Sequence, residues 1–166
     1  TYTVKYFKDG AEVTADEQKE TKQIWVNDTK APVEKSAINT TDKYEGFSFD
    51  ADTTGVIPDT IGNDGVIRVY YVKDESQTKN ITYTVKYFKD GTEVTEDQQT
   101  KTDTVWVNAS SNMTVDKTAI NTTDKYVGYK LDTSATGTIP DTVTDGDVIN
   151  VYYVRDNDQK KAVSYT

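Results

Sequence analysis

The chain is built from an internal repeat, and this repeat constrains its fold more than any other feature. The stretch YTVKYFKDG occupies Tyr2–Gly10 and recurs unchanged at Tyr83–Gly91. AINTTDKY occurs at Ala37–Tyr44 and again at Ala119–Tyr126, one residue later than the first spacing predicts. This self-similarity indicates homologous modules in tandem. VSYT at the C-terminus matches ITYT at 81–84, so we expect the chain to be part of a longer array. We predict repeat 1 at 1–74, a linker at 75–81, repeat 2 at 82–156, and a linker with the start of a third repeat at 157–166.

Each repeat opens and closes with a sequence typical of a half-buried strand. YTVKYF alternates its residues so that Tyr2, Val4 and Tyr6 share one face, and KDG then supplies a turn. The closing sequences are VIRVYYV and VINVYYV. Their alternation predicts an inward face in each repeat, formed in repeat 1 by Ile67, Val69 and Tyr71.

The middle of each repeat is less clear. QIWVN and TVWVN predict a second strand, ending at Asn27 and Asn108. The segment before Tyr44 fits a helical turn around residues 33–38 and a strand at 43–49. We expect the one-residue length difference between the repeats to lie in a surface loop after the Trp strand.

The exposed aromatics are the best functional lead. If Ile24 and Val26 point inward, alternation turns Trp25 outward, and the same pattern turns Trp106 outward. Tyr70 and its copy Tyr152 lie outward on the closing strands. An outward Trp beside an outward Tyr could stack on a sugar ring or on a partner's side chain. The alternative is that these rings cap a thin core or pack between repeats.

Composition excludes several classes of function. The chain has no cysteine and no histidine, and its net charge is −9. Disulfides, thiol nucleophiles, imidazole bases and ordinary zinc sites are therefore excluded. The acidic balance disfavours nucleic acids, and no apolar run is long enough to cross a bilayer. We expect a monomer with no cofactor, no nucleic-acid partner and no membrane insertion.

Acidic and amide side chains suggest two further chemistries. Acidic turns at residues 59–64 and 141–147 could supply oxygen ligands to calcium, although plain turn chemistry fits them better. The carboxylates are otherwise scattered through turns and linkers, so we predict no enzyme activity. Lys86 and Asn150 could form an isopeptide bond between the first and last strands. Repeat 1 has Arg68 in place of Asn150, so a cross-link shared by both repeats is excluded.

The framework residues resemble a known family. A V-K-Y strand followed by DG, a Y-x-G-(Y/F) element at Tyr44–Phe47 and Tyr126–Tyr129, and a closing V-Y-Y strand are similar to the MucBP and Listeria-type B-repeat modules of Gram-positive surface adhesins. The resemblance implies a mainly β (α+β), β-grasp-like fold in tandem arrays of cell-wall-anchored, extracellular proteins. If the end strands run parallel and adjacent, the two repeats form an elongated rod.

Two functions follow from these expectations. The first is a non-catalytic stalk or spacer that projects the binding domain of a bacterial cell-surface adhesin. The second is that the repeats themselves bind host mucin glycans or a host surface protein. In that case the binding residues would be the aromatics Trp25, Tyr70, Trp106 and Tyr152.

Overall fold

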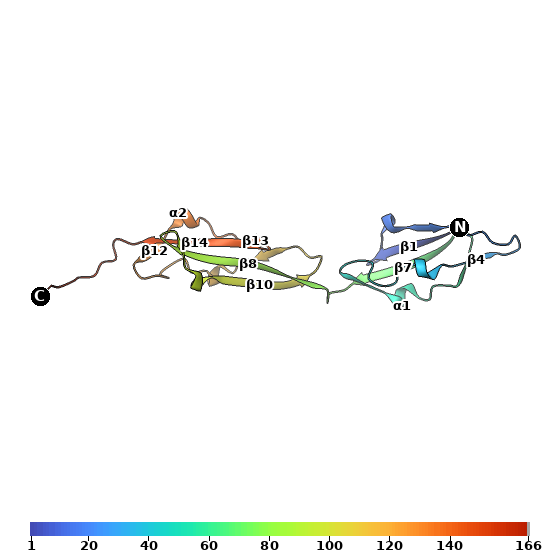
Figure 1. The fold of residues 1–166 in the computed structure, drawn as a ribbon, viewed down its shortest axis with the longest axis horizontal. Helices are drawn as coiled ribbons and strands as arrows, with labels where there is room; N and C mark the ends of the chain where they lie inside the picture. The colour runs from blue at the N-terminus through green and yellow to red at the C-terminus, as the bar shows by residue number, and fades with distance from the viewer. Residues whose placement is uncertain (166) are drawn as a thin grey trace. The chain divides into compact units, whose positions relative to one another are not determined.

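The computed structural model describes residues 1–165 of the 166-residue chain, which forms two compact units (Figure 1). The first contains Thr1–Thr78 and the short segment Trp106–Asn108, and the second contains the other described residues from Lys79 onward. Two similar mixed sheets form two tandem repeats that are mainly β with short helices, which confirms the predicted fold class.

The first repeat has a five-stranded sheet in the order β2-β1-β7-β5, with β3 also paired to β1. A separate two-stranded sheet joins β4 to β6. The elements are β1 (Tyr2–Lys8), β2 (Ala11–Glu12), η1 (Thr14–Asp16), β3 (Gln18–Glu20), β4 (Lys30–Pro32), η2 (Lys35–Ala37), β5 (Phe47–Phe49), α1 (Ala51–Thr54), β6 (Thr60–Gly62) and β7 (Gly65–Lys73).

The second repeat has the same design, with the order β10-β8-β14-β12, β9 paired to β8, and a small β11-β13 sheet. Its first strand begins at Thr78, within the residues that the sequence suggests as a linker. The elements are β8 (Thr78–Lys89), β9 (Thr92–Glu93), η3 (Thr95–Asp97), β10 (Gln99–Trp106), β11 (Asn112–Thr114), η4 (Lys117–Ala119), β12 (Tyr129–Leu131), α2 (Thr133–Thr136), β13 (Thr142–Thr144) and β14 (Asp147–Arg155).

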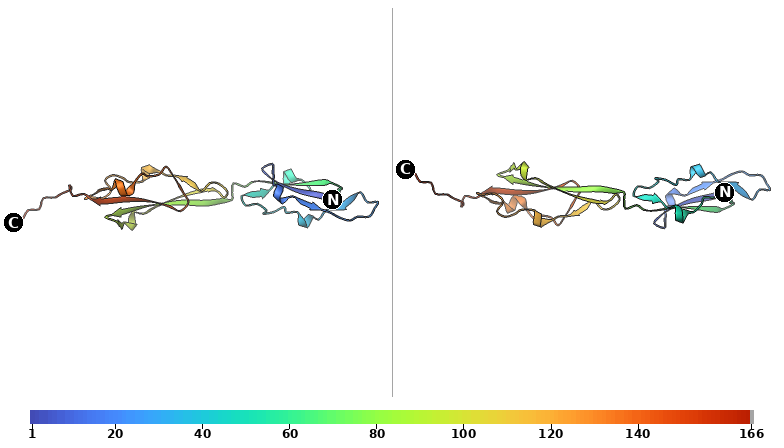
Figure 2. Two further views of the ribbon diagram at one scale, coloured as in Figure 1. Left: turned by 90° about the horizontal axis from the view of Figure 1, so that it is seen from above. Right: turned by 90° about the horizontal axis from the view of Figure 1, so that it is seen from below.

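A parallel pair of strands lies at the centre of each sheet. β1 and β7 are in register from Tyr2 opposite Gly65 to Lys8 opposite Tyr71. β8 and β14 pair in the same way from Tyr83 opposite Asp147. The views of Figures 1 and 2 show both pairs side by side. The first and last strands of a repeat are therefore adjacent and parallel, as the resemblance implies.

The core of each repeat lies on the inward face that the alternation predicts. In repeat 1 it contains the side chains of Tyr2, Val4, Tyr6, Ile38, Ile67, Val69 and Tyr71, all at most 5% exposed. The hairpin turn after β1 has positive φ at both Asp9 and Gly10, which suits the right-handed twist of the flanking strands. The predicted inward residues of both end strands are thus confirmed.

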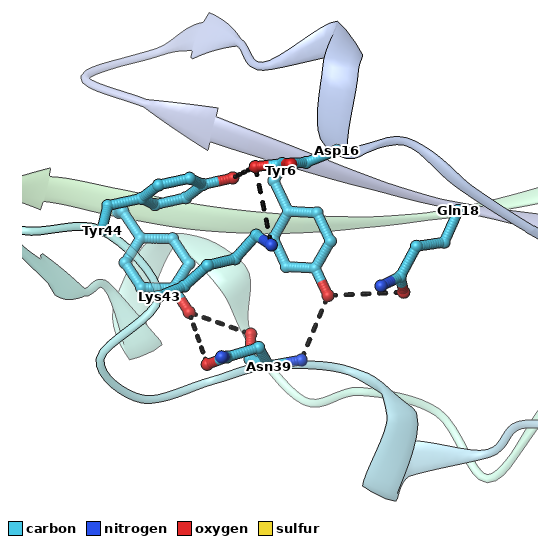
Figure 3. Close-up of polar contacts among 7 residues, drawn as sticks. Tyr6, Asp16, Gln18, Asn39, Lys43 and Tyr44 are labelled. Atoms are coloured by element: carbon cyan, nitrogen blue, oxygen red, sulfur yellow. Dashed lines mark hydrogen bonds and ion pairs between the residues drawn. The ribbon is translucent and has the colours of Figure 1, made fainter.

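Buried tyrosines tie the irregular segment before Tyr44 to the sheet (Figure 3). The hydroxyl of Tyr6 accepts a hydrogen bond from the Asn39 amide at 3.1 Å, and the Tyr71 hydroxyl donates to the Asn39 carbonyl at 3.0 Å. The Tyr2 hydroxyl accepts from the Glu34 amide. These bonds satisfy phenols that would otherwise be costly to bury. The segment itself contains one 3₁₀ turn, η2.

The predicted strand at QIWVN is wrong in repeat 1. Residues 21–25 have no regular structure, and Ile24 and Val26 are 41% and 87% exposed instead of inward. In repeat 2 the corresponding strand, β10, reaches Trp106. A strand needs a hydrogen-bonding neighbour, and β8 begins five residues before Tyr83, the equivalent of Tyr2. β10 pairs with this early part of the second sheet through β8, whereas no strand among the described residues pairs with residues 21–25.

Two short helices were not predicted. α1 and α2 follow Asp50 and Asp132, whose carboxylates accept hydrogen bonds from the amides of Thr53 and Ala135. Both helices end at a glycine with positive φ. None of the helices in residues 1–165 combines the length and apolar character needed to cross a bilayer.

Candidate functional site

The parallel central pair determines how a repeat is connected to the rest of the chain. β1 begins where β7 begins, and both run in the same direction. The chain therefore enters repeat 1 at one end of the sheet, at Tyr2, and leaves it at the other, at Lys73. A force applied to these two ends loads the hydrogen bonds between the strands in shear. The β8–β14 pair of repeat 2 has the same geometry.

Tyr70 and Tyr152 are half-buried on the outward face of the closing strands. Tyr70 stacks on Phe7 with ring centroids 4.8 Å apart, and Tyr152 stacks on Phe88 at 4.7 Å. Each pair joins the two central strands of its repeat. The rings therefore reinforce the parallel pair on the face opposite the core.

Trp25 lies elsewhere in repeat 1. Its neighbour Ile24 lines a shallow hollow with Thr1 and Asn63, at the end of the sheet where β1 starts. Tyr70 lies towards the other end of the same strand pair, opposite Phe7. Within residues 1–165 no aromatic ring pair joins a predicted Trp to a predicted Tyr. The indole of Trp25 is 66% exposed and stands alone.

Trp106 makes specific contacts with other residues of the first unit. Its indole Nε1 donates to the Gly46 carbonyl at 3.1 Å. Its ring meets Phe47 edge-on with centroids 5.6 Å apart, and the Lys73 ammonium lies 4.8 Å from the ring centre. An edge contact and a cation over the face each stabilise an aromatic ring. The indole is accordingly half-buried.

The residues after Trp106 extend this contact. The amide of Val107 donates to the Gln77 carbonyl at 2.8 Å, and the side-chain amide of Asn108 donates to the Glu45 carbonyl at 2.7 Å. Gly46 has a φ of +81°, and a Cβ built on it would lie 2.4 Å from Asn108 Nδ2. Only glycine therefore fits under the segment Trp106–Asn108.

Gln77 holds the Gly46 turn in shape. Its Oε1 accepts from the Gly46 amide at 2.8 Å, and its Nε2 donates to the Phe47 carbonyl at 3.2 Å. The sequence identified Gly46 and Asn108 only as a framework residue and a strand end, and it gave no role to Gln77. The available signal was that W-V-N, the Y-x-G element and the Gln after the closing strand occur in both repeats at matching positions.

A second polar cluster covers the tyrosine core of each repeat. The Tyr44 hydroxyl donates to Asp16 at 2.6 Å, and Lys43 lies 3.5 Å from the same carboxylate and over the Tyr6 ring (Figure 3). The Tyr44 hydrogen bond is the main reason that the pKa of Asp16 lies below its ordinary value. Burial raises the pKa of Tyr71 to about 12.

The acidic side chains of both turns bond to groups within their own repeat. Asp59 pairs with Lys35 and Asp141 pairs with Lys117, each at 2.7 Å. The Asp145 carboxylate accepts from the Thr82 amide. In the described part of the chain no three acidic, Cys or His side chains gather as metal ligands would.

The register places the two residues of the considered cross-link opposite each other. Lys86 faces Asn150, whereas the equivalent Lys5 faces Arg68. The Lys86 ammonium is already paired with Glu93 at 3.2 Å. Repeat 1 makes the same type of pair, and both lie on the solvent face.

Comparisons with known proteins give weak structural likenesses. No family model and no curated protein matches the chain. A type 2 repeat of the mucus binding protein MUB from Lactobacillus reuteri is 16% identical with a TM-score of 0.31, covering 93% of this chain and 98% of that one. The structure named Mub-RV is 18% identical with a TM-score of 0.32, covering 93% and 98%.

A third solved structure contains domains 3–4 of the Streptococcal High Identity Repeats in Tandem (SHIRT) of a cell surface protein. It is 15% identical with a TM-score of 0.34 and covers 94% of this chain and 99% of that one. The chain is thus similar to repeats of Gram-positive surface proteins. Identities and TM-scores of this size do not assign it to a family.

Proposed function

We propose that these repeats serve as a non-catalytic stalk of a bacterial cell-surface adhesin and carry a binding domain away from the cell wall. The parallel register of β1 and β7, repeated in β8 and β14, is the observation that supports this function most directly. Under tension such a pair yields only when several hydrogen bonds break together. The stacked pair of Phe7 and Tyr70 adds side-chain contact across the same strands.

The direction of the backbone groups in β7 makes a sharp test available. The Tyr70 amide donates to Thr54 Oγ1, whereas the Tyr71 carbonyl accepts from the Asp9 amide, both at 2.9 Å. The backbone N–H and C=O groups of Tyr71 therefore point towards β1, and those of Tyr70 point away from it. Because successive amides alternate in a strand, the Arg68 amide also faces away from β1.

The same reasoning places the Lys5 amide in the central ladder. The Tyr6 carbonyl accepts from the Val13 amide at 2.8 Å. The backbone groups of Tyr6 therefore point away from β7, and those of Lys5 point towards it. Lys5 and Arg68 are cross-strand neighbours with outward side chains. Proline at either position removes one amide, but only at Lys5 does that amide belong to the β1–β7 ladder.

The experiment is single-molecule pulling of the chain by its two ends. The parent should show two unfolding events at high force. Lys5→Pro should lower the force of one event, while Arg68→Pro should leave both nearly unchanged. Lys5→Ala loses the ion pairs to Glu12 and Glu17 but keeps the backbone amide. It therefore distinguishes the effect of the lost ion pairs from the effect of the lost hydrogen bond between the strands. If the parent unfolded at the same force as Lys5→Pro, the proposal that the β1–β7 pair resists tension would be contradicted.

The exposed indole of Trp25 favours a second function, binding of a host mucin glycan or host surface protein. A flat aromatic surface of this kind can stack on a sugar ring. A glycan array probed with the parent and with Trp25→Ala tests it. A signal that the substitution removes, with no change in folding, would make the repeats adhesive.

A further inference from the structure

The second unit carries a copy of the surface that holds Trp106 in the first unit. Gly128 has a φ of +83°, its amide donates to Gln159 Oε1 at 2.9 Å, and its carbonyl accepts from Asp156. Gln159 Nε2 also donates to the Tyr129 carbonyl. We call Val127–Tyr129, Arg155 and Gln159 the Gly128 surface. Each of its bonds matches one at Gly46, so the surface is already formed.

Nothing in the described chain covers this surface. A Cβ built on Gly128 has no atom within 4 Å, whereas at Gly46 it would lie 2.9 Å from Trp106 Cζ2. Val127 is 98% exposed. A hollow bordered by Gly128, Gln159 and Lys161 lies open beside it. At Gly46 the equivalent carbonyl groups hold the indole of Trp106 and the side chain of Asn108, so the same groups are open to an equivalent segment at Gly128.

The matching segment lies exposed in the first unit. Trp25-Val26-Asn27 repeats the letters of Trp106–Asn108, and its Trp and Val are 66% and 87% exposed. The Asp28 amide donates to the Trp25 carbonyl at 2.9 Å, so the segment already forms a turn. The chain thus has one Trp-Val-Asn segment that is docked and one that is not.

We propose that the Gly128 surface binds the Trp25–Asn27 segment of a second copy of this chain. The Gly128 carbonyl would accept the Trp25 indole N–H, and the Val127 carbonyl would accept the Asn27 side chain. Tyr129 takes the place of Phe47 at the ring edge, and Arg155 takes the place of Lys73 as the cation over the ring. Either replacement keeps the type of contact.

Charge supports the same occupant. Lys79 donates to the Ala109 carbonyl at 2.7 Å, directly after the docked Asn108. Lys161 is the equivalent of Lys79, and Asp28 is the equivalent of Ala109. Lys79 also donates to the Ser111 hydroxyl at 3.2 Å, and in the proposed complex the Asp28 carboxylate adds an opposite charge for Lys161 to meet. This inference does not depend on whether the repeats bear load.

The test joins two copies with the natural spacing. Residues 1–163 of one copy are fused to residues 1–166 of the next, because Val163 is the equivalent of Ile81 and Thr1 of Thr82. Linking raises the effective concentration of the two surfaces without adding a contact. Tryptophans are replaced by 5-fluorotryptophan, assigned one at a time by Trp→Phe, and their exposure is read from the H₂O/D₂O shift of each fluorine resonance.

In the single chain we expect one exposed indole, Trp25, and one protected indole, Trp106. In the fusion only Trp25 of the first copy should be exposed, and the other three should be protected. Gly128→Ala in the first copy should expose Trp25 of the second copy again. In the single chain the same substitution should leave both resonances in place. This control shows whether backbone strain alone changes the exposure of a tryptophan when no second copy is docked.

Asn27→Ala in the second copy provides an independent variant that leaves Gly128 intact. It should also expose the neighbouring Trp25, whereas Asn27→Ala in the first copy should change nothing. The proposal fails if Trp25 of the second copy stays exposed in the fusion. It also fails if that indole is protected but neither variant exposes it, or if a mucin glycan protects Trp25 of the single chain while the fusion does not.

Discussion

The segments Trp25–Asn27 and Trp106–Asn108 have the same sequence and different surroundings. Trp106 ends a strand, donates a hydrogen bond and lies against Phe47. Trp25 follows an irregular stretch and is 66% exposed. The two repeats share the register of their central strands and the hydrogen bonds of their buried tyrosines. The difference teaches that a neighbour, rather than the local sequence, decides whether this segment becomes a strand with a packed ring.

The largest expected effect comes from truncating the two tryptophans. Trp106→Ala should lower the free energy of unfolding by about 2 to 3 kcal/mol, since the half-buried ring loses its packing and its hydrogen bond. Trp25→Ala should change it by less than about 0.5 kcal/mol. Urea unfolding followed by circular dichroism measures both. Equal effects would show that the two segments have the same environment in solution.

The tyrosine clusters should not distinguish the repeats. Tyr44→Phe and Tyr126→Phe each remove a hydrogen bond to a carboxylate, of Asp16 and Asp97 respectively. Each should cost about 1.5 kcal/mol of unfolding free energy, because bonds to charged groups are stronger than neutral ones. A much larger cost in one repeat would mean that the difference between the repeats extends beyond the Trp segments.

The same clusters predict sensitivity to acid. Hydrogen bonds from Tyr44 and Tyr126 hold the pKa of Asp16 and Asp97 below the ordinary value. The stability from these carboxylates is therefore present above the ordinary carboxyl pKa and is lost as pH falls through the lowered folded value. The double variant Tyr44→Phe, Tyr126→Phe should flatten this acid limb. Urea midpoints at a series of pH values measure it, and an unchanged slope would contradict the assignment.

Alanine substitutions at Gly46 and Gly128 measure how much the Trp106–Asn108 segment adds to the cost of a side chain at the turn. Gly46 and Gly128 share a positive φ, so either substitution should cost about 1 kcal/mol in strain. Gly46→Ala should cost roughly 1 kcal/mol more, because its Cβ must displace Asn108 and Trp106. The difference should disappear in an Asn108→Ala, Trp106→Ala background.

The last prediction expects no effect. Lys86 faces Asn150 in repeat 2, but its ammonium is paired with Glu93 on the solvent face. We expect the intact mass to equal the mass calculated from the sequence. In repeat 1 the equivalent pair is Lys5 and Arg68, which cannot form an isopeptide bond. A deficit of one ammonia, located by fragmentation at Lys86 and Asn150, would reveal a covalent difference between the repeats.

Much of the fold follows from local patterns. The alternation of Tyr2, Val4 and Tyr6, and that of the closing strand, predicts which side chains of each strand are buried. Such alternation is clear in the sequence because one face of the sheet is exposed to solvent and the other is buried. The predicted strand at Trp25 was wrong because no strand among the described residues pairs with it, whereas β10 pairs with β8. α1 was missed because a four-residue helix has no periodicity, and only its Asp50 cap indicates it.

The candidate site was only partly accessible from sequence. The repeated letters indicate that Trp25, Trp106 and the Y-x-G element matter, and the structure places Trp106 against Gly46. That contact joins residues 60 apart in the chain. No local rule connects an indole to a carbonyl at that separation, so its partner could not be named from the sequence.

The tyrosine bonds to Glu34 and Asn39 bear on how the chain withstands proteases. A protease must draw an extended stretch of backbone into its cleft, and irregular segments are its usual targets. Here the amides of Glu34 and Asn39 are held by the hydroxyls of Tyr2 and Tyr6, whose rings are at most 1% exposed. Drawing residues 34–39 into a protease would break these bonds to the core, so we expect this stretch, which has only the short turn η2, to resist cleavage about as well as the sheet beneath it.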